Sequence, residues 1–231
     1  MNERMRMNKQ RFFEPFVGDK YQEGINGKKI LVVGASFYCN HTKCQFFLKC
    51  TNTENKDSSQ FDDKCPEYVK TGKQLHREPT YCINDAPRTY KTFAAYISTL
   101  IGDESYEQAW SYLAFTNYVQ FFLPCKGKSF RDTRMTDLSE RDFHAFNETL
   151  VELQPDIVII WGCVFNSRLR EENEYIVDKS ELGQSEWYVC HINVPGCHHD
   201  VTLINPYHPS SSAWHSKIDT FDKYLSMELT K

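Results

Sequence analysis

Short runs of consecutive apolar residues, each stopped by glycine, asparagine or proline, are the feature that most constrains the fold of this chain. The most regular run is Asp156-Ile-Val-Ile-Ile-Trp-Gly162, and another extends from Lys29 to Val33 and stops at Gly34. Because their core positions are all apolar, these runs predict strands buried on both faces, as in a parallel sheet. Three further strands are predicted over 113–119, 187–193 and 201–205.

Helical periodicity separates these strands. Residues 88–101 place Phe93, Ile97 and Leu100 on one face, and Gly102 follows where a helix commonly ends. Further helices are predicted over 104–112, from the capping pattern Ser139-Glu-Arg-Asp142 to Pro155, and from Ala213 onward.

The alternation of strands and helices predicts an α/β protein, organised as a three-layer α/β/α sandwich with a mainly parallel central sheet. We expect a single domain over 1–231, in which 1–27 form an N-terminal arm and 50–87 form an irregular polar insertion. The phenylalanines expected to pack the arm onto the body are Phe12, Phe13 and Phe16.

Composition and charge narrow the classes of partner. The 231 residues carry a formal net charge of −4 and are 40% hydrophobic and 25% charged, so the chain is expected to fold and has no global basic field. One local basic cluster contains Lys126, Lys128, Arg131 and Arg134. Aromatic residues, at 14%, mainly suit a core, and a minority of them suit stacking on bases.

Segments that direct a chain to a membrane or to secretion are not recognised in the sequence. The apolar runs are shorter than the roughly 18–20 residues of a membrane span, and the N-terminus lacks the apolar region of a secretory signal. We therefore expect a cytoplasmic protein without a membrane partner, in which disulfides are rare.

Polar residues follow two of the predicted strands. Ser36 and Tyr38 come directly after the strand that ends at Gly34, and His208 follows the strand over 201–205. Because loops that leave the carboxyl ends of neighbouring parallel strands converge on one crevice, these two loops are expected to form the working face of the protein.

Four short motifs occur in the order seen in one enzyme superfamily. They are Gly34-Ala-Ser-Phe-Tyr-Cys39, Asn117, Ile157-Val-Ile-Ile-Trp-Gly162 and His208-Pro-Ser210. In this order, and each at a predicted strand end, they resemble the motifs of the uracil-DNA glycosylase superfamily. The resemblance implies an α/β/α fold, DNA or another nucleobase-containing ligand as partner, and hydrolysis of the N-glycosidic bond of a flipped or single-stranded base.

The resemblance also implies roles for individual residues. His208 would stabilise negative charge on the departing base, and Asn117 would read the Watson–Crick edge of a pyrimidine. Tyr38 would close the pocket, and Ser210 would bind a flanking phosphate. Phe46 or Phe47 would supply a stacking ring, with the choice between them open. The other substrate-binding positions implied by the motifs are Gly34, Ala35, Phe37, Pro209 and Trp214, the last as the nearest large apolar residue to the position of the family's wedge.

Ser36 departs from the superfamily pattern. The most active members carry an aspartate at this third position of the first motif, where it orients water and stabilises the cationic sugar. A serine holds a water through its hydroxyl but has no carboxylate charge. An alternative function is therefore a non-catalytic nucleic-acid or nucleotide-binding module.

The cysteines offer a competing hypothesis. No cofactor is expected by default, but Cys39, Cys44, Cys50 and Cys65 supply enough thiolates for a zinc ion or an iron–sulfur cluster. Structural interpretations of the motif residues also stay open. His208 then caps the last helix, Asn117 is a turn residue at a strand end, and Trp161-Gly162 only ends a strand.

Overall fold

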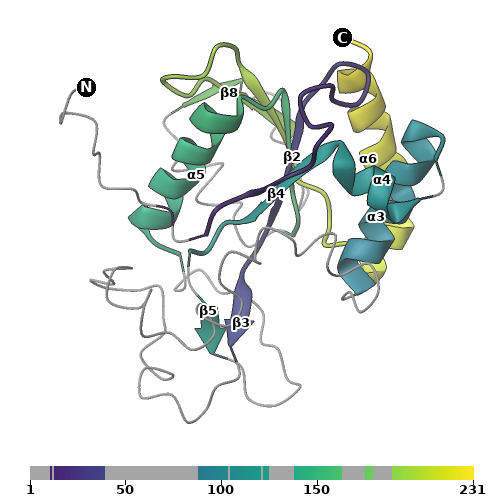
Figure 1. Cartoon of the computed structure of the whole chain (residues 1–231), viewed down its shortest axis with the longest axis horizontal. Helices are drawn as coiled ribbons and strands as arrows, with labels where there is room; N and C mark the ends of the chain where they lie inside the picture. Colours follow the sequence, from purple (N-terminus) through teal and green to yellow (C-terminus); the bar gives the residue numbers. More distant parts are fainter. Residues whose placement is uncertain are drawn as a thin grey trace.

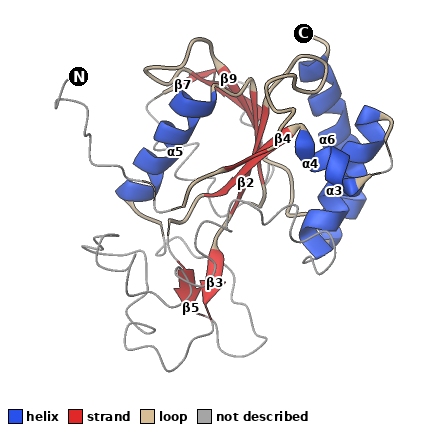
Figure 2. Cartoon of the chain, in the orientation of Figure 1, coloured by secondary structure: helices blue, strands red, loops and turns tan. Residues whose placement is uncertain are grey.

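A helix-covered sheet forms the body of the protein. The computed structural model describes residues 11, 13–39, 88–103, 105–120, 122–124, 138–162, 175–178 and 189–231. In this part of the chain, α5 (Glu140–Leu153) covers one face of the sheet, and α3 (Arg88–Ile101), α4 (Tyr106–Ser111) and α6 (Ser212–Leu229) cover the other (Figures 1 and 2). The predicted three-layer α/β architecture is confirmed.

Seven strands of the described residues form the main sheet in the order β1-β4-β2-β6-β9-β8-β7. Its four central strands, β4, β2, β6 and β9, are parallel. At one edge β1 pairs antiparallel with β4, and at the other β8 pairs antiparallel with both β9 and β7. The bounds are β1 (Phe16–Val17), β2 (Ile30–Gly34), β4 (Leu113–Asn117), β6 (Ile157–Ile160), β7 (Ile176–Asp178), β8 (Val189–Ile192) and β9 (Val201–Ile204). The parallel centre is as predicted, whereas the antiparallel edges were not.

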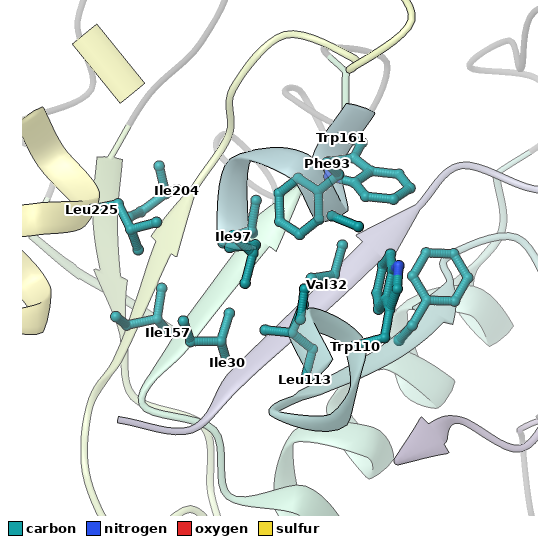
Figure 3. Packing of buried hydrophobic residues seen from close by; sticks show 14 of the residues in the cluster. Ile30, Val32, Phe93, Ile97, Trp110, Leu113, Ile157, Trp161, Ile204 and Leu225 are labelled. Carbon is teal, nitrogen blue, oxygen red and sulfur yellow. The ribbon is translucent and has the colours of Figure 1, made fainter. Parts of the chain in front are cut away.

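The apolar runs form the central strands because both faces of these strands are covered. Ile30 and Val32 of β2 pack in the cluster under α3, α4 and α6, while Leu31 and Val33 pack in the cluster under α5. All four side chains are fully buried. Figure 3 shows the first cluster, in which Ile30 and Ile157, partners in the register of β2 and β6, lie side by side and Phe93, Trp110 and Trp161 supply aromatic rings.

The helix ends follow the sequence signals. Gly102 adopts a positive φ of 69° after α3, as the predicted end of that helix requires. At the start of α5, the capping box of Ser139 and Asp142 is formed: the backbone N–H of Ser139 donates to Oδ2 of Asp142 at 2.9 Å. The C-cap Gln154 has left-handed backbone geometry, and Pro155 follows it.

A second, two-stranded parallel sheet extends the carboxyl end of β2. It pairs β3 (Phe37–Cys39) with β5 (Phe122–Pro124) and lies beyond the main sheet in Figure 1. Phe13 of the N-terminal arm packs edge-on against Phe37 at 4.7 Å and against Phe122 at 5.1 Å. The arm is therefore packed onto the body at Phe13, as predicted.

The order of the parallel strands creates a switch point. From β2 the chain continues to β4 on one side and then returns to β6 on the other side of β2. In open α/β sheets the crevice for a ligand lies outside the carboxyl ends of the strands at such a point. Among the helices of the described residues, none has both the length and the apolar character needed to cross a membrane.

Candidate functional site at the carboxyl ends of the parallel strands

The motif residues lie at one edge of the main sheet. Gly34 and Asn117 are the last residues of β2 and β4, Trp161 follows β6, and His208 lies in the loop after β9. Since these four strands are parallel neighbours, their carboxyl ends are on the same side. The four strand ends therefore lie at one edge of the sheet, and a single working face formed by the loops of Ser36, Tyr38 and His208 stays a prediction.

Three of these residues form a row across adjacent strands. Gly34 pairs with Asn117 in the register of β2 and β4. On its other side, Val33 pairs with Ile160, so Trp161 is the next position beside Gly34, and the backbone N–H of Trp161 donates to the carbonyl of Val33 at 2.9 Å. Because side chains alternate along a strand, all three members of the row face α3 and α6.

Gly34 makes room for the amide of Asn117. A Cβ placed on Gly34 would lie 2.3 Å from Oδ1 of Asn117, a separation that non-bonded atoms do not tolerate. Asn117 is only 3% exposed, and its Nδ2 has no hydrogen-bond partner among the described residues. Because buried donors in native proteins are nearly always paired, this unpaired donor calls for an explanation.

The turn after Asn117 is held rigidly against the first motif. The backbone N–H groups of Tyr118 and Val119 donate to the carbonyls of Gly34 (2.9 Å) and Ala35 (3.0 Å). Gln120, which is buried, donates through Nε2 to the carbonyl of Asn117 at 2.8 Å. Its backbone N–H in turn donates to the carboxylate of Asp142 at 2.8 Å. These bonds limit the freedom of the backbone that carries the amide.

An asparagine joins the ends of β6 and β9. Asn205 is fully buried, and its Nδ2 donates to the carbonyl of Ile160 at 2.7 Å and to the carbonyl of Gly162. Gly162 adopts a positive φ of 88°, and its N–H donates to the carbonyl of Pro206 at 3.1 Å. These contacts tie the Trp161–Gly162 turn to the start of the His208 loop.

His208 is a half-buried residue with a defined tautomer. The backbone N–H of Ser210 donates to Nδ1 of His208 at 3.3 Å, and the Ser210 hydroxyl lies 2.8 Å from the same nitrogen. Nδ1 is therefore an acceptor, and the proton of the neutral imidazole resides on Nε2. The ring stands edge-on to Trp161 with 6.1 Å between centroids. The carbonyl of His208 accepts from the hydroxyl of Ser211, the N-cap of α6, at 2.7 Å.

The other residues expected at the site differ in exposure. Ala35, Ser36 and Tyr38 are half-buried after β2, and Ser210 is exposed. Phe37 is buried and packs against Phe13 and Phe122, and Pro209 is also buried. Phe46 and Phe47 lie outside the described residues.

Trp214 requires a correction. Its side chain is 3% exposed and packs against Phe93 at 6.1 Å and Phe221 at 5.4 Å in the core beneath α6. A wedge that enters nucleic acid needs an exposed side chain, so the expectation that Trp214 supplies one is wrong. The residue anchors α6 instead.

The metal hypothesis falls mostly outside the described residues. Cys44, Cys50 and Cys65 and the side chain of Cys39 are not among them. In the residues that are described, no three His, Cys, Asp or Glu side chains come together as metal ligands. Cys197 is a free thiol, and partial burial raises its pKa. Metal binding by the four cysteines stays a prediction.

The sequence did not single out Trp161 and Asn205 as members of the site. Trp161 is 2% exposed, its indole Nε1 has no partner among the described residues, and the same is true of Oδ1 of Asn205. In the sequence, both residues carry a polar side-chain atom and stand directly before a residue that ends a strand: Trp161 before Gly162, and Asn205 before Pro206. Their partners lie more than 40 residues away, so the pattern alone does not reveal their contacts.

A separate hollow of about 260 Å³ lies near the amino end of β4, between β1 and α4. Lys20 lines this hollow, and its ammonium group donates to Oε1 of Gln108 at 3.0 Å and lies 5.0 Å from the centroid of the Tyr112 ring. None of the motif residues lines this hollow.

Comparison with known proteins adds no relative: no protein-family model matches the chain, and a search of curated proteins finds no match. Any function assigned to the chain therefore rests on the geometry of its strand ends.

Proposed function

We propose that this protein binds a nucleobase at the carboxyl ends of β4, β2 and β6 and hydrolyses the N-glycosidic bond that links the base to its sugar, as the resemblance to uracil-DNA glycosylases implies. The substrate is a flipped or single-stranded nucleotide of DNA, because a base inside a duplex does not reach such a crevice.

The amide of Asn117 is the observation that carries the proposal. A primary amide offers a donor and an acceptor in one plane, which matches the edge of a pyrimidine. The amide lies over Gly34, where a larger residue would displace it, and its Nδ2 is buried without a partner among the described residues. A structural turn residue has no need of this glycine or of an unpaired donor.

His208 supplies the chemistry in this proposal. Breaking the N-glycosidic bond leaves negative charge on the base, and a proton on Nε2 of a neutral imidazole is a suitable donor to that charge. Preorganised donors of this kind contribute about 3–4 kcal/mol to stabilisation of the transition state in comparable enzymes. The bonds from Ser210 to Nδ1 support this role because they select the tautomer with the proton on Nε2.

The electrostatics of the edge favour a polyanion. α3 and α6 both begin beside the motif residues, and neither has an acidic residue in its first turn. Each helix N-terminus carries a partial positive charge, to which Arg88 and Lys91 of α3 and Lys217 of α6 add. A phosphate backbone is the natural ligand for such an edge, and binding should weaken as salt rises.

A second candidate, favoured by Ser36, is base binding without hydrolysis. Ser36 stands where the most active members of the superfamily that the chain resembles carry an aspartate, and it supplies no negative charge to stabilise a cationic sugar. In that case the amide and the crevice serve recognition alone.

Incubation with labelled single- and double-stranded DNA that contains one uracil, hypoxanthine or mismatched thymine, followed by alkali, tests the proposal. The proposal predicts strand scission at one of these bases, slowed about 100- to 1,000-fold in His208→Ala. His215→Ala provides the matched control, because His215 is exposed on α6, and should cleave at the wild-type rate.

The outcomes separate the two candidates. Base-dependent binding without scission supports the second candidate, and Ser36→Asp should then create measurable cleavage. If the protein neither cleaves these substrates nor prefers them to an abasic oligonucleotide, both candidates are wrong.

A further inference from the structure

The imidazole of His208 is held by two different segments of the chain. Within its own loop, the backbone N–H of Ser210 donates to Nδ1 at 3.3 Å, and the Ser210 hydroxyl lies 2.8 Å from the same nitrogen. A second contact comes from the end of β6, where the indole of Trp161 stands edge-on to the imidazole with 6.1 Å between centroids and 76° between planes. This geometry is one in which aromatic pairs attract each other.

The turn that carries Trp161 is fixed to the loop that carries His208. A Cβ placed on Gly162 would lie 3.8 Å from Cβ of His208, which is ordinary van der Waals contact. The N–H of Gly162 donates to the carbonyl of Pro206 at 3.1 Å, and Nδ2 of Asn205 donates to the carbonyl of Gly162. These bonds keep the indole in place against the imidazole.

The neighbouring rings limit how Trp161 itself can move. Its indole is 2% exposed and packs edge-on against Phe93 (5.1 Å) and Tyr90 (5.7 Å) of α3. Figure 3 shows Trp161 and Phe93 side by side, and Phe115 of β4 lies 5.5 Å from the same indole. Because a densely packed interior leaves such rings little room to turn, the indole is a rigid support for His208.

Rotation of an imidazole by half a turn exchanges the places of its nitrogens with those of two ring carbons, so Nε2 no longer points where it did. The bonds from Ser210 favour one of these orientations, and a packed neighbour hinders the rotation. We propose that Trp161 is a positioning residue, which keeps the His208 ring in the orientation that Ser210 selects. The catalytic value of this orientation rests on the proposed function, whereas the orientation itself does not.

¹⁵N spectra of the histidine rings at pH 8, above the ordinary histidine pKa of about 6.5, test the orientation in Trp161→Leu. The His208 signals are assigned by their loss in His208→Ala. In the wild type we expect one protonated and one unprotonated nitrogen, and in Trp161→Leu we expect both signals to shift toward those of the exposed His215. Trp110→Leu is the matched control, because Trp110 is buried in the same cluster and its ring contacts among the described residues do not include His208.

Single-turnover cleavage separates positioning from binding. Because His208 acts on the departing base, Trp161→Leu should slow cleavage about tenfold, less than the loss in His208→Ala. Its affinity for a single-stranded DNA with one 2′-fluorinated uracil nucleotide, whose glycosidic bond resists hydrolysis, should change less than about threefold. Trp161→Phe keeps a ring against the imidazole and should recover most of the rate.

Each outcome decides the inference. If the His208 signals of Trp161→Leu stay as in the wild type, or shift equally in Trp110→Leu, the inference is overturned. If they shift as expected but the wild-type protein cleaves none of the substrates, the inference holds and the proposed hydrolysis is wrong. Should Trp161→Leu fail to fold, nuclear Overhauser contacts between the indole and imidazole protons of the wild type decide. We expect contacts to one edge of the imidazole, and contacts to both edges or to neither would contradict the inference.

Discussion

Replacement of Gly34 by alanine is the perturbation whose consequence follows most directly from the structure. The new Cβ would lie 2.3 Å from Oδ1 of Asn117 and 3.2 Å from Cζ of Phe115. To restore van der Waals contact, the amide oxygen has to retreat by roughly 1 Å. Because the blocking atom is at the end of a side chain, we expect the Asn117 amide to rotate away while β2 and β4 stay paired.

The expected effects on stability and on binding differ in size. Overpacking of this kind lowers the free energy of unfolding by about 1–3 kcal/mol. Replacing a strand glycine by alanine raises it by about 0.5–1 kcal/mol, because the unfolded chain has less conformational entropy. The net loss in free energy of unfolding is therefore about 0–2.5 kcal/mol. Binding of a base should fall much more, since displacement of the amide removes two hydrogen bonds worth about 1–1.5 kcal/mol each, or roughly 30- to 150-fold in affinity.

A double-mutant cycle of Gly34→Ala and Asn117→Ala, followed by urea denaturation, measures this interaction. In the Asn117→Ala background the alanine at position 34 has no amide to displace, so it should cost nothing or add about 0.5–1 kcal/mol. The coupling free energy should then be about 1–3 kcal/mol. Equal cost of Gly34→Ala in the two backgrounds would refute the claim that Gly34 exists to accommodate Asn117.

Three further predictions concern the residues that support the site and the helices. Asn205→Ala removes two buried hydrogen bonds to the end of β6 and should lower the free energy of unfolding by about 2–4 kcal/mol, which urea denaturation would detect as a lower midpoint at an unchanged slope. Asp142→Ala loses both the capping box and the bond from the Gln120 backbone and should also cost about 2–4 kcal/mol, so a loss below 1 kcal/mol would contradict its role in holding the turn. Burial, with the hydrogen bond and charge of Asp222, raises the pKa of the Tyr96 hydroxyl, so its stabilisation is complete below the ordinary tyrosine pKa of about 10 and is lost as pH rises above it. The stability advantage of the wild type over Tyr96→Phe should therefore shrink by about 1.4 kcal/mol per pH unit above pH 10, and thermal denaturation that shows a constant difference between pH 8 and pH 11 would count against this.

The central strands could be predicted from the sequence because their local pattern is sufficient. A continuous apolar run needs burial on both faces, and β2, β6 and β9 have it. The edge strands lacked such a signal. β1 has only two residues, and the partner of β3 lies about 85 residues along the chain in β5.

The candidate site was predicted only in part, because a local sequence pattern marks strand ends but does not reveal contacts between distant segments. Residues at or just beyond strand ends, such as Gly34, Asn117 and His208, are visible as polar or small residues after apolar runs. The packing of the Asn117 amide over Gly34 could not be predicted from the sequence, because this contact exists only once β2 and β4 are paired.

Trp214 shows a different kind of error, because the sequence contained the information that would have prevented it. Phe221 and Leu225 follow Trp214 by 7 and 11 residues, which places all three on one face of α6. That spacing is typical of a buried stripe, and all three side chains are buried in the same cluster. Helical periodicity was therefore a better guide here than distance from His208 along the chain.

Base-dependent binding tests the central claim most directly. Fluorescence anisotropy should compare two labelled single-stranded oligonucleotides that differ only in one position, which holds either a hydrolysis-resistant uracil nucleotide or an abasic analogue. We predict that the wild-type protein binds the uracil oligonucleotide at least tenfold more tightly, and that Asn117→Ala removes this preference while keeping the salt-dependent affinity for the backbone. Equal affinity of the wild-type protein for the two oligonucleotides would contradict a base-binding site at these strand ends.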